Sequence, residues 1–136
     1  EDKILILGRF PLERMPSFYA HADALLVTLK KDPVFGMTIP GKVQSYLLAG
    51  IPILALLDGE GARVINEANA GNVSPSGDAV GLAESVLMML KLSHQDRKQL
   101  GLNGRAYAQQ EFSRELAMDR LEALFQEALD LDKLVT

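Results

Sequence analysis

Three short, continuous apolar runs constrain the fold of this chain most strongly. They are KILIL at residues 3–7, ALLVTL at 24–29 and IPILALL at 51–57, and a weaker fourth run, GNVSP, follows at 71–75. Apolar runs of this length, without polar alternation, are typical of strands that are buried on both faces of a parallel sheet. We therefore expect four strands in one parallel sheet.

Segments with helical periodicity separate these runs. Apolar side chains recur there at three- and four-residue steps: Leu12, Met15, Phe18, Tyr19 and Ala22; then Val43, Tyr46 and Leu47; then Ala62, Ile65 and Ala68. The runs begin about twenty to thirty residues apart, which is the length of a strand followed by a crossover helix. The pattern predicts an α/β fold, a Rossmann-like open parallel sheet with flanking helices.

The last third of the chain has a different pattern. From about residue 77 to residue 136 the sequence is helical with short breaks, which predicts a C-terminal helical tail. Ser93 and Asp96 have the spacing of a capping box, and Ser113 is a suitable N-cap for the last helix. That helix carries an apolar stripe that we expect to pack against the sheet or a neighbouring domain: Ala117, Leu121, Leu124, Ala128 and Leu131.

The size of the chain favours one domain. Its 136 residues are 48% hydrophobic and 24% charged, which is enough for a single core and argues against disorder. The chain starts at Glu1 without a methionine and enters an apolar run almost at once. We expect residues 1–136 to form one domain, truncated at its N-terminus.

Charge and composition exclude several classes of function. The net charge of −4 and the lack of a long basic run argue against binding to nucleic acid or to an anionic membrane surface. The absence of cysteine excludes disulfides, thiol catalysis and thiolate metal sites, and fits a cytoplasmic location. His21 and His94 lack the neighbours of a catalytic triad or a metal cluster, so we predict no metal and no cofactor.

Ligands of an open parallel sheet bind where the carboxyl ends of the strands lead into helix N-termini. Three predicted loops occupy that position: residues 8–10, residues 30–36 and residues 58–61. Each of these loops contains glycine, and the second is longer than a simple connection needs. We expect the functional site among them.

The helix after the second loop has the features of an anion site. Thr38 is a suitable N-cap, Pro40 is acceptable in the first turn, and Gly50 with Pro52 ends the helix. Gly41 leaves the first-turn amides accessible and Lys42 adds a positive charge, so a phosphate or diphosphate fits there. The alternative is that Gly41 eases a tight turn and Lys42 is merely solvated.

Two further groups near this helix also allow two interpretations. Tyr46 is one turn beyond Lys42 and is most simply a half-buried ring. The turn Gly59-Glu60-Gly61 lacks the spacing and the lysine of a dinucleotide or ATP loop. Glu60 could accept hydrogen bonds from the hydroxyls of a sugar, or it could be a first-turn carboxylate that complements the helix dipole.

Four stretches, taken in order, resemble the C-terminal nucleotide-sugar-binding domain of retaining glycosyltransferases of the two-domain GT-B type, particularly bacterial enzymes of polysaccharide assembly. They are LGRFPLERMPSFYAHADALLV (7–27), FGMTIPGKVQSYLLAGIPILA (35–55), GEGARVINEANAGNVSPSGDAVGLAESV (59–86) and LGLNGRAYAQQEFSRELAMDRLEALF (100–125). Together they cover nearly the whole chain. The second and third are fairly specific in combination.

The resemblance implies positions for the parts of a donor. It places the nucleobase near Gly8, Arg9 and Phe10, and the diphosphate and sugar near Phe35, Gly36, Met37, Thr38, Gly41 and Lys42, with Glu60 as a candidate sugar contact. Ser45 and Met37 stand where the family has its ribose-binding and sugar-binding glutamates. We expect both positions to lie in the donor site. The resemblance implies that Lys42 and nearby groups take over the contacts that the glutamates make in the family.

The resemblance also implies a function and partners. The whole enzyme would move a sugar from a nucleoside-diphosphate donor, UDP- or GDP-linked, to a glycan or lipid-linked acceptor without a metal. An N-terminal domain of the same chain would bind the acceptor and make any membrane contact, so the fragment alone would be inactive. The alternatives are a flavodoxin-like receiver or regulatory domain and a nucleotide-sugar epimerase of the same build.

Overall fold

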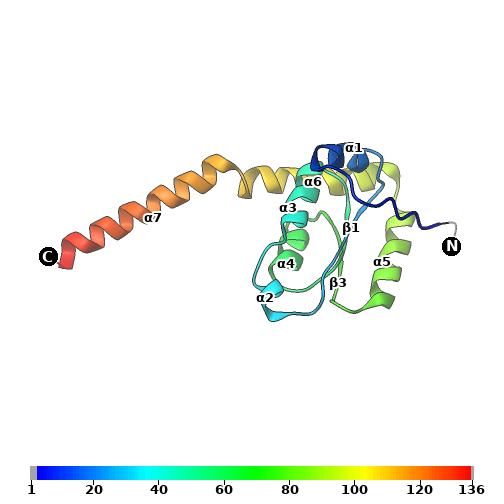
Figure 1. Ribbon diagram of the computed structural model, residues 1–136, viewed down its shortest axis with the longest axis horizontal. Helices are drawn as coiled ribbons and strands as arrows, with labels where there is room; N and C mark the ends of the chain where they lie inside the picture. Colours follow the sequence, from blue (N-terminus) through cyan, green and yellow to red (C-terminus); the bar gives the residue numbers. More distant parts are fainter. Residues whose placement is uncertain (1–2, 136) are drawn as a thin grey trace.

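The computed structural model describes the backbone of residues 3–135 and the side chains of residues 3–130. Its elements are η1 (Leu12–Arg14), α1 (Met15–Tyr19), β1 (Leu25–Thr28), α2 (Pro33–Gly36), α3 (Gly41–Ala49), β2 (Ile53–Leu56), α4 (Glu60–Glu67), β3 (Gly71–Ser74), α5 (Ala79–Lys91), α6 (His94–Glu111) and α7 (Arg114–Val135). Strands and helices alternate up to β3, and helices follow (Figure 1). The predicted α/β class, with a Rossmann-like parallel sheet and a helical tail, is confirmed.

The sheet has three parallel strands in the order β1-β2-β3. Leu25 of β1 is paired with Ile53 of β2, which is paired with Gly71 of β3. Gly71 lies so close to the carbonyl oxygen of Ile53 that a Cβ atom at position 71 would collide with it. Three of the four predicted strands are therefore present, with ends that differ from the prediction by one or two residues.

The strand predicted at residues 3–7 is wrong. This segment has no strand structure, and its side chains are exposed, Ile4 by 78% and Ile6 by 92%. An apolar run forms a strand only where another strand supplies hydrogen-bond partners for its backbone. Among the described residues, no strand lies alongside this segment. Its apolar character alone is therefore not enough to make it a β-strand.

The two faces of the sheet are covered by different helices. On one face, Val27, Ile53 and Ala55 pack with buried residues from α3, α4 and α6, which are Val43, Leu47, Val64, Ile65 and Ala108. On the other face, α5 packs against β2 and β3, and the hydroxyls of Ser74 and Ser85 lie 3.2 Å apart. Leu26 of β1 points to this second face and is 53% exposed, so α5 leaves β1 partly uncovered.

The predicted caps of the helical tail are present. In the capping box of α6, the Asp96 amide donates to Ser93 Oγ at 3.1 Å and the Ser93 amide donates to Asp96 Oδ2 at 3.3 Å. At the start of α7, the Leu116 amide donates to Ser113 Oγ at 3.1 Å. Each cap satisfies an amide that the helix itself leaves without a partner.

The apolar stripe of α7 does not pack against the sheet. The helix extends away from the rest of the molecule (Figure 1), and Leu121 and Leu124 are 43% and 61% exposed. The side chain of Leu131, the last residue of the predicted stripe, lies outside the described residues. Packing on the sheet would need a turn that folds α7 back, whereas α7 continues outward after only two residues, Phe112 and Ser113.

Candidate functional site

The carboxyl ends of the three strands meet in one small pocket. Leu29 and Lys30 follow β1, Asp58 follows β2 and Ser76 follows β3, and all four line this pocket together with Phe35 and Gly36 of α2. The Ser76 amide donates to Asp58 Oδ1 at 3.2 Å, which joins the loops after β2 and β3. We call residues 29–42, 58–61 and 76 the strand-end corner. Asp58 belongs to the predicted loop at residues 58–61, although no role of its own was predicted for it.

Part of the predicted second loop is the short helix α2. Asp32 is its N-cap, because the Val34 amide donates to Asp32 Oδ1 at 2.8 Å, and Pro33 occupies its first turn. An aspartate followed by proline is a common helix start, and this signal in the sequence was overlooked. The next side chains face solvent, with Phe35 46% and Met37 71% exposed.

Helix α3 begins later than predicted. Pro40 is its N-cap, with an extended backbone at φ −60° and ψ 137°, and its carbonyl accepts the Val43 amide at 2.9 Å. The predicted cap, Thr38, is two residues too early, and its hydroxyl donates to the carbonyl of Phe35 at 3.4 Å instead. The reason is that Pro40 keeps the preceding residue out of the helical region.

The N-terminus of α3 is open to a ligand. A Cβ atom at Gly41 would meet nothing within 4 Å, so no packing constraint explains this glycine. Lys42 is exposed, and no ion pair among residues 3–130 engages its ammonium group. Gly41 and Lys42 are therefore both accessible at the first turn of α3, where helix amides lack intrahelical partners.

Two glycines hold the start of α4 against α2 and α3. Gly59, the N-cap of α4, has φ 71° and lies against the backbone of Gly36, whose carbonyl oxygen a Cβ atom would strike. A Cβ atom at Gly61 would lie 3.0 Å from Pro40 Cδ. The fold thus places Gly36 and Pro40, the residue before Gly41, against the Gly59-Glu60-Gly61 turn, which is about twenty residues further along the chain.

Glu60 already has a partner within α4. Arg63 donates to Glu60 Oε2 from Nε at 2.9 Å and from Nη2 at 2.7 Å, and Arg63 Nη1 donates to Glu67 Oε2 at 2.6 Å. The hydrogen bond from Arg63 is the main cause that lowers the pKa of Glu60. Glu67 also has a lowered pKa, first because of Arg63 and then because Tyr107 donates to it. Glu60 is held as an ionised acceptor at the edge of the corner.

Ser45 does not line the pocket at the strand ends. Its hydroxyl donates to the carbonyl of Gly41 at 3.0 Å. It lines a separate pocket of about 490 Å³ between α1 and α3, together with Pro16 and Tyr19. Tyr46, next to Ser45, packs edge-on against Tyr19 at 5.5 Å between ring centroids, and burial raises its pKa. Tyr46 therefore packs as the half-buried ring that the simplest interpretation expects.

Gly8, Arg9 and Phe10 are not brought to the strand-end corner. The Phe10 ring packs against Phe18 at 4.9 Å, and the Arg14 guanidinium lies 5.5 Å from the Phe10 ring centroid. In Figure 1, α1 and α2 lie at opposite ends of β1, and the dark-blue segment before α1 stays at the α1 end. The role of these three residues in nucleobase binding stays a prediction.

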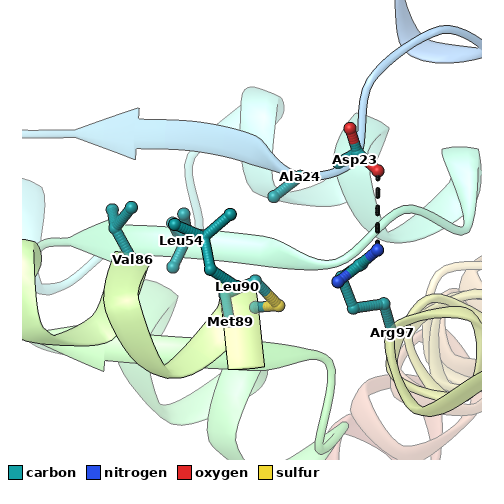
Figure 2. Close-up of a pocket in the computed structure, with 7 residues that line it drawn as sticks. All are labelled: Asp23, Ala24, Leu54, Val86, Met89, Leu90 and Arg97. Carbon is teal, nitrogen blue, oxygen red and sulfur yellow. Dashed lines mark ion pairs between the residues drawn. The ribbon is translucent and has the colours of Figure 1, made fainter. Parts of the chain in front are cut away.

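An apolar pocket of about 230 Å³ lies on the α5 side of the sheet, away from the corner. Figure 2 shows Ala24 and Leu54 from the strand layer facing Val86, Met89 and Leu90 of α5. At its edge, Arg97 Nη2 lies 3.9 Å from Asp23 Oδ1, a long contact in which Asp23 is largely exposed. The lining is mostly apolar and offers little for a polar donor, so this pocket is not a candidate donor site.

The described residues contain neither a membrane-spanning helix nor a metal-binding cluster. Residues 3–135 contain no helix that is long and apolar enough to cross a membrane. Within that same part of the chain, no group of three or more His, Cys, Asp or Glu side chains is arranged to hold a metal ion.

Two curated proteins are similar to this chain over nearly its full length. A protein of Pseudomonas aeruginosa named "Probable glycosyltransferase WbjE" is 30% identical over 134 residues, which are 97% of this chain and 32% of that protein. The "N-acetyl-alpha-D-glucosaminyl L-malate synthase" of Bacillus anthracis is 23% identical over 133 residues, 98% of this chain and 33% of that protein. No protein-family model matches the chain, and no solved structure matches it significantly.

The chain spans about a third of the length of the curated relatives that it matches. Its architecture, a parallel sheet flanked by helices with a long C-terminal helix, agrees with one half of a GT-B fold. The predicted resemblance and the fold are thus confirmed by independent observations. The chain is similar, over nearly its whole length, to about a third of a probable glycosyltransferase and of an N-acetyl-alpha-D-glucosaminyl L-malate synthase.

Proposed function

We propose that this chain is the donor-binding part of a retaining glycosyltransferase. The whole protein would transfer a sugar from a UDP- or GDP-linked donor to a glycan or lipid-linked acceptor. An acceptor-binding domain of the same polypeptide would face the strand-end corner and complete the active site. The similarity to glycosyltransferases supports the reaction class, and the geometry of the corner supports the donor site.

One observation carries the proposal. The N-termini of α3 and α4 lie side by side at the carboxyl edge of the sheet, because Gly61 of α4 packs against Pro40 of α3. Two helix N-termini that face one region concentrate free amides and positive potential there. The diphosphate of a nucleotide sugar carries the negative charge that such a region attracts.

The residues of the corner have distinct proposed roles. The open first turn at Gly41 would bind a phosphate through backbone amides, and Lys42 would pair with its charge. Phe35, Gly36 and Met37 would line the path of the diphosphate and sugar. Glu60, held by Arg63 through Oε2, would offer its other oxygen, Oε1, to a sugar hydroxyl. Thr38 and Ser45 would make only indirect contributions, because their hydroxyls donate to the backbone of Phe35 and Gly41.

The same arrangement suits departure of the nucleoside diphosphate. Negative charge develops on the leaving phosphate oxygen as the glycosidic bond breaks, and fixed amide dipoles with Lys42 would stabilise it without reorganisation. This role needs no bound metal. The chemistry at the anomeric carbon would depend on groups outside this corner, since its carboxylates already have partners: Asp32 and Asp58 accept backbone amides, and Glu60 is paired with Arg63.

The test uses the full-length protein. Titration calorimetry with UDP, GDP, TDP and their sugars should show binding of at least one nucleoside diphosphate. Transfer from that donor, followed by NMR of the product, should show a glycoside with the anomeric configuration of the donor. Absence of binding to every nucleoside diphosphate would end the proposal. An inverted product would remove only the retaining mechanism.

The two alternatives predict other products. An epimerase would convert a nucleotide sugar without any acceptor, so incubation of donor alone distinguishes it from a transferase. A receiver domain would be labelled by acetyl phosphate. The relatives' printed names favour neither alternative.

A further inference from the structure

Arg105 of α6 forms hydrogen bonds with the C-terminal end of α3. We infer that Arg105 is a positioning residue for the donor site: it fixes the C-terminal end of α3 and thereby the placement of the Gly41–Lys42 end. The inference rests on the proposed function, because it concerns the same site. It links a residue of the helical tail to a corner of the sheet that it does not touch.

The contacts of Arg105 are directed at two helix carbonyls. Its Nε donates to the carbonyl of Leu48 at 3.1 Å, and its Nη2 donates to the carbonyl of Ala49 at 2.8 Å. These carbonyls belong to the last turn of α3, where the helix provides no amide partners of its own. A guanidinium in this place also complements the negative end of the helix dipole. The Arg105 side chain thus fixes the position of this helix end and offsets its partial negative charge.

Three glycines let Arg105 and its helix approach closely. A Cβ atom at Gly101 would collide with the carbonyl oxygen of Gly50, and one at Gly104 would lie 3.0 Å from Leu47 Cδ2. A Cβ atom at Gly50 would lie 2.9 Å from Arg105 Nε. Gly101, Gly104 and Arg105 share one face of α6, because they are separated by three and four residues. This face of α6 therefore allows close packing against the C-terminal end of α3.

Helix α3 is short enough to transmit this restraint. Its nine residues span about 14 Å, so that one rigid segment joins the Arg105 contact to the first-turn amides. Val43 and Leu47 are fully buried at 0% exposure and hold one side of the helix against the core, and the Arg105 hydrogen bonds add a restraint at its C-terminal end. A displacement at Ala49 would therefore appear at Gly41. Small misplacements of binding groups are known to lower catalytic rates strongly.

A second arginine on the same helix provides a matched control. Arg97 lies two turns earlier, and its Nη1 donates to the carbonyl of Leu92 at 2.8 Å, at the end of α5. Both arginines therefore bond a helix-end carbonyl, but only Arg105 bonds α3. Removal of the Arg105 side chain costs two hydrogen bonds, and removal of the Arg97 side chain costs one hydrogen bond and the long contact with Asp23. Only the removal of Arg105 should change the donor site.

The experiment compares Arg105→Met, Arg105→Lys and Arg97→Met in the full-length protein, at a temperature where all three are folded. We expect Arg105→Met to weaken UDP or GDP binding, measured by calorimetry, and to lower kcat/KM about tenfold. Arg105→Lys keeps the charge and one donor, so it should recover part of this loss. Arg97→Met should change affinity less than twofold even if its melting temperature falls as far.

Amide hydrogen exchange gives a readout that does not depend on ligand. Arg105→Met should speed exchange at Val43 and Gln44, whose amides bond to Pro40, while Arg97→Met should not. If the wild-type protein binds no nucleoside diphosphate, the proposed function fails, and the exchange rates alone decide whether Arg105 orders the start of α3. Equal nucleotide affinity and equal exchange rates in Arg105→Met and Arg97→Met would overturn the inference. Should Arg105→Met not fold, Arg105→Lys serves for both measurements.

Discussion

Gly59 lies directly against the carbonyl group of Gly36, so that the N-cap of α4 and the end of α2 share a space that no side chain could enter. This contact joins two loops that leave neighbouring strands. Gly59 also has a positive φ of 71°, which a residue with a Cβ atom adopts only with strain.

Gly59→Ala should therefore destabilise the protein by two separate effects, strain and collision. Gly77 is a matched control, because its φ is 88° but a Cβ atom there would meet nothing within 4 Å. Gly77→Ala should cost about 1 kcal/mol, and Gly59→Ala about 3 kcal/mol or more. Urea denaturation measures both free energies of unfolding. Equal losses would mean that the contact with Gly36 adds nothing.

Lys42→Ala should weaken nucleoside-diphosphate binding if the open end of α3 is the anion site. The expected loss is about 1–3 kcal/mol, the scale of one charged hydrogen bond. Folding should be unaffected, since Lys42 is exposed. Lys91→Ala, at the distant end of α5, is the control. Calorimetry with UDP and GDP tests the prediction, and an unchanged affinity would remove Lys42 from the site.

Glu60→Gln should lower turnover more than nucleotide affinity if Glu60 contacts the sugar. Glu67→Gln is a close control, because Glu67 is the other carboxylate that Arg63 bonds and lies about two turns further along α4. Steady-state kinetics should show a lower kcat for Glu60→Gln alone. Similar kinetics for both variants would show that the loss comes from the Arg63 pairs and not from sugar binding.

The ion pairs of Arg63 with Glu60 and Glu67 should also make a small contribution to the free energy of unfolding that is lost at acidic pH. Because the pKa values of Glu60 and Glu67 are lowered from 4.5, ionisation favours the folded state. This contribution is complete above pH 4.5 and is lost as the pH falls through the lowered values. The difference in melting temperature between wild type and Arg63→Gln should shrink between about pH 5 and pH 3, and 0.5 M salt should reduce it at neutral pH. A difference that grows on acidification would contradict this.

Much of the fold followed from local patterns. The runs at 24–29, 51–57 and 71–75 became strands, since each pairs with another of the three in the sheet. Ser93, Asp96 and Ser113 became caps, because a cap depends only on residues close in sequence. The run at 3–7 failed for the opposite reason, since a strand depends on a partner that its own residues do not reveal.

The candidate site was predicted less completely. Gly36, Gly41 and Glu60 were chosen separately. The contacts that join their loops, Gly59 with Gly36 and Gly61 with Pro40, follow from strand order, which a single sequence expresses only through the alternation of strands and helices. The start of α3 at Pro40 and the role of Asp58 depend on backbone geometry across loops. Arg105 could not be found at all, because its partners lie more than fifty residues away.

The outer edge of β1 has a consequence for handling the protein. Within residues 3–135, β1 pairs only with β2, and Leu26 next to this edge is half exposed. An unpaired parallel edge beside an apolar surface is a template on which another chain can add a strand. Preparations of these 136 residues alone should therefore become turbid as their concentration rises, so solubility is a direct measure of whether this edge is covered.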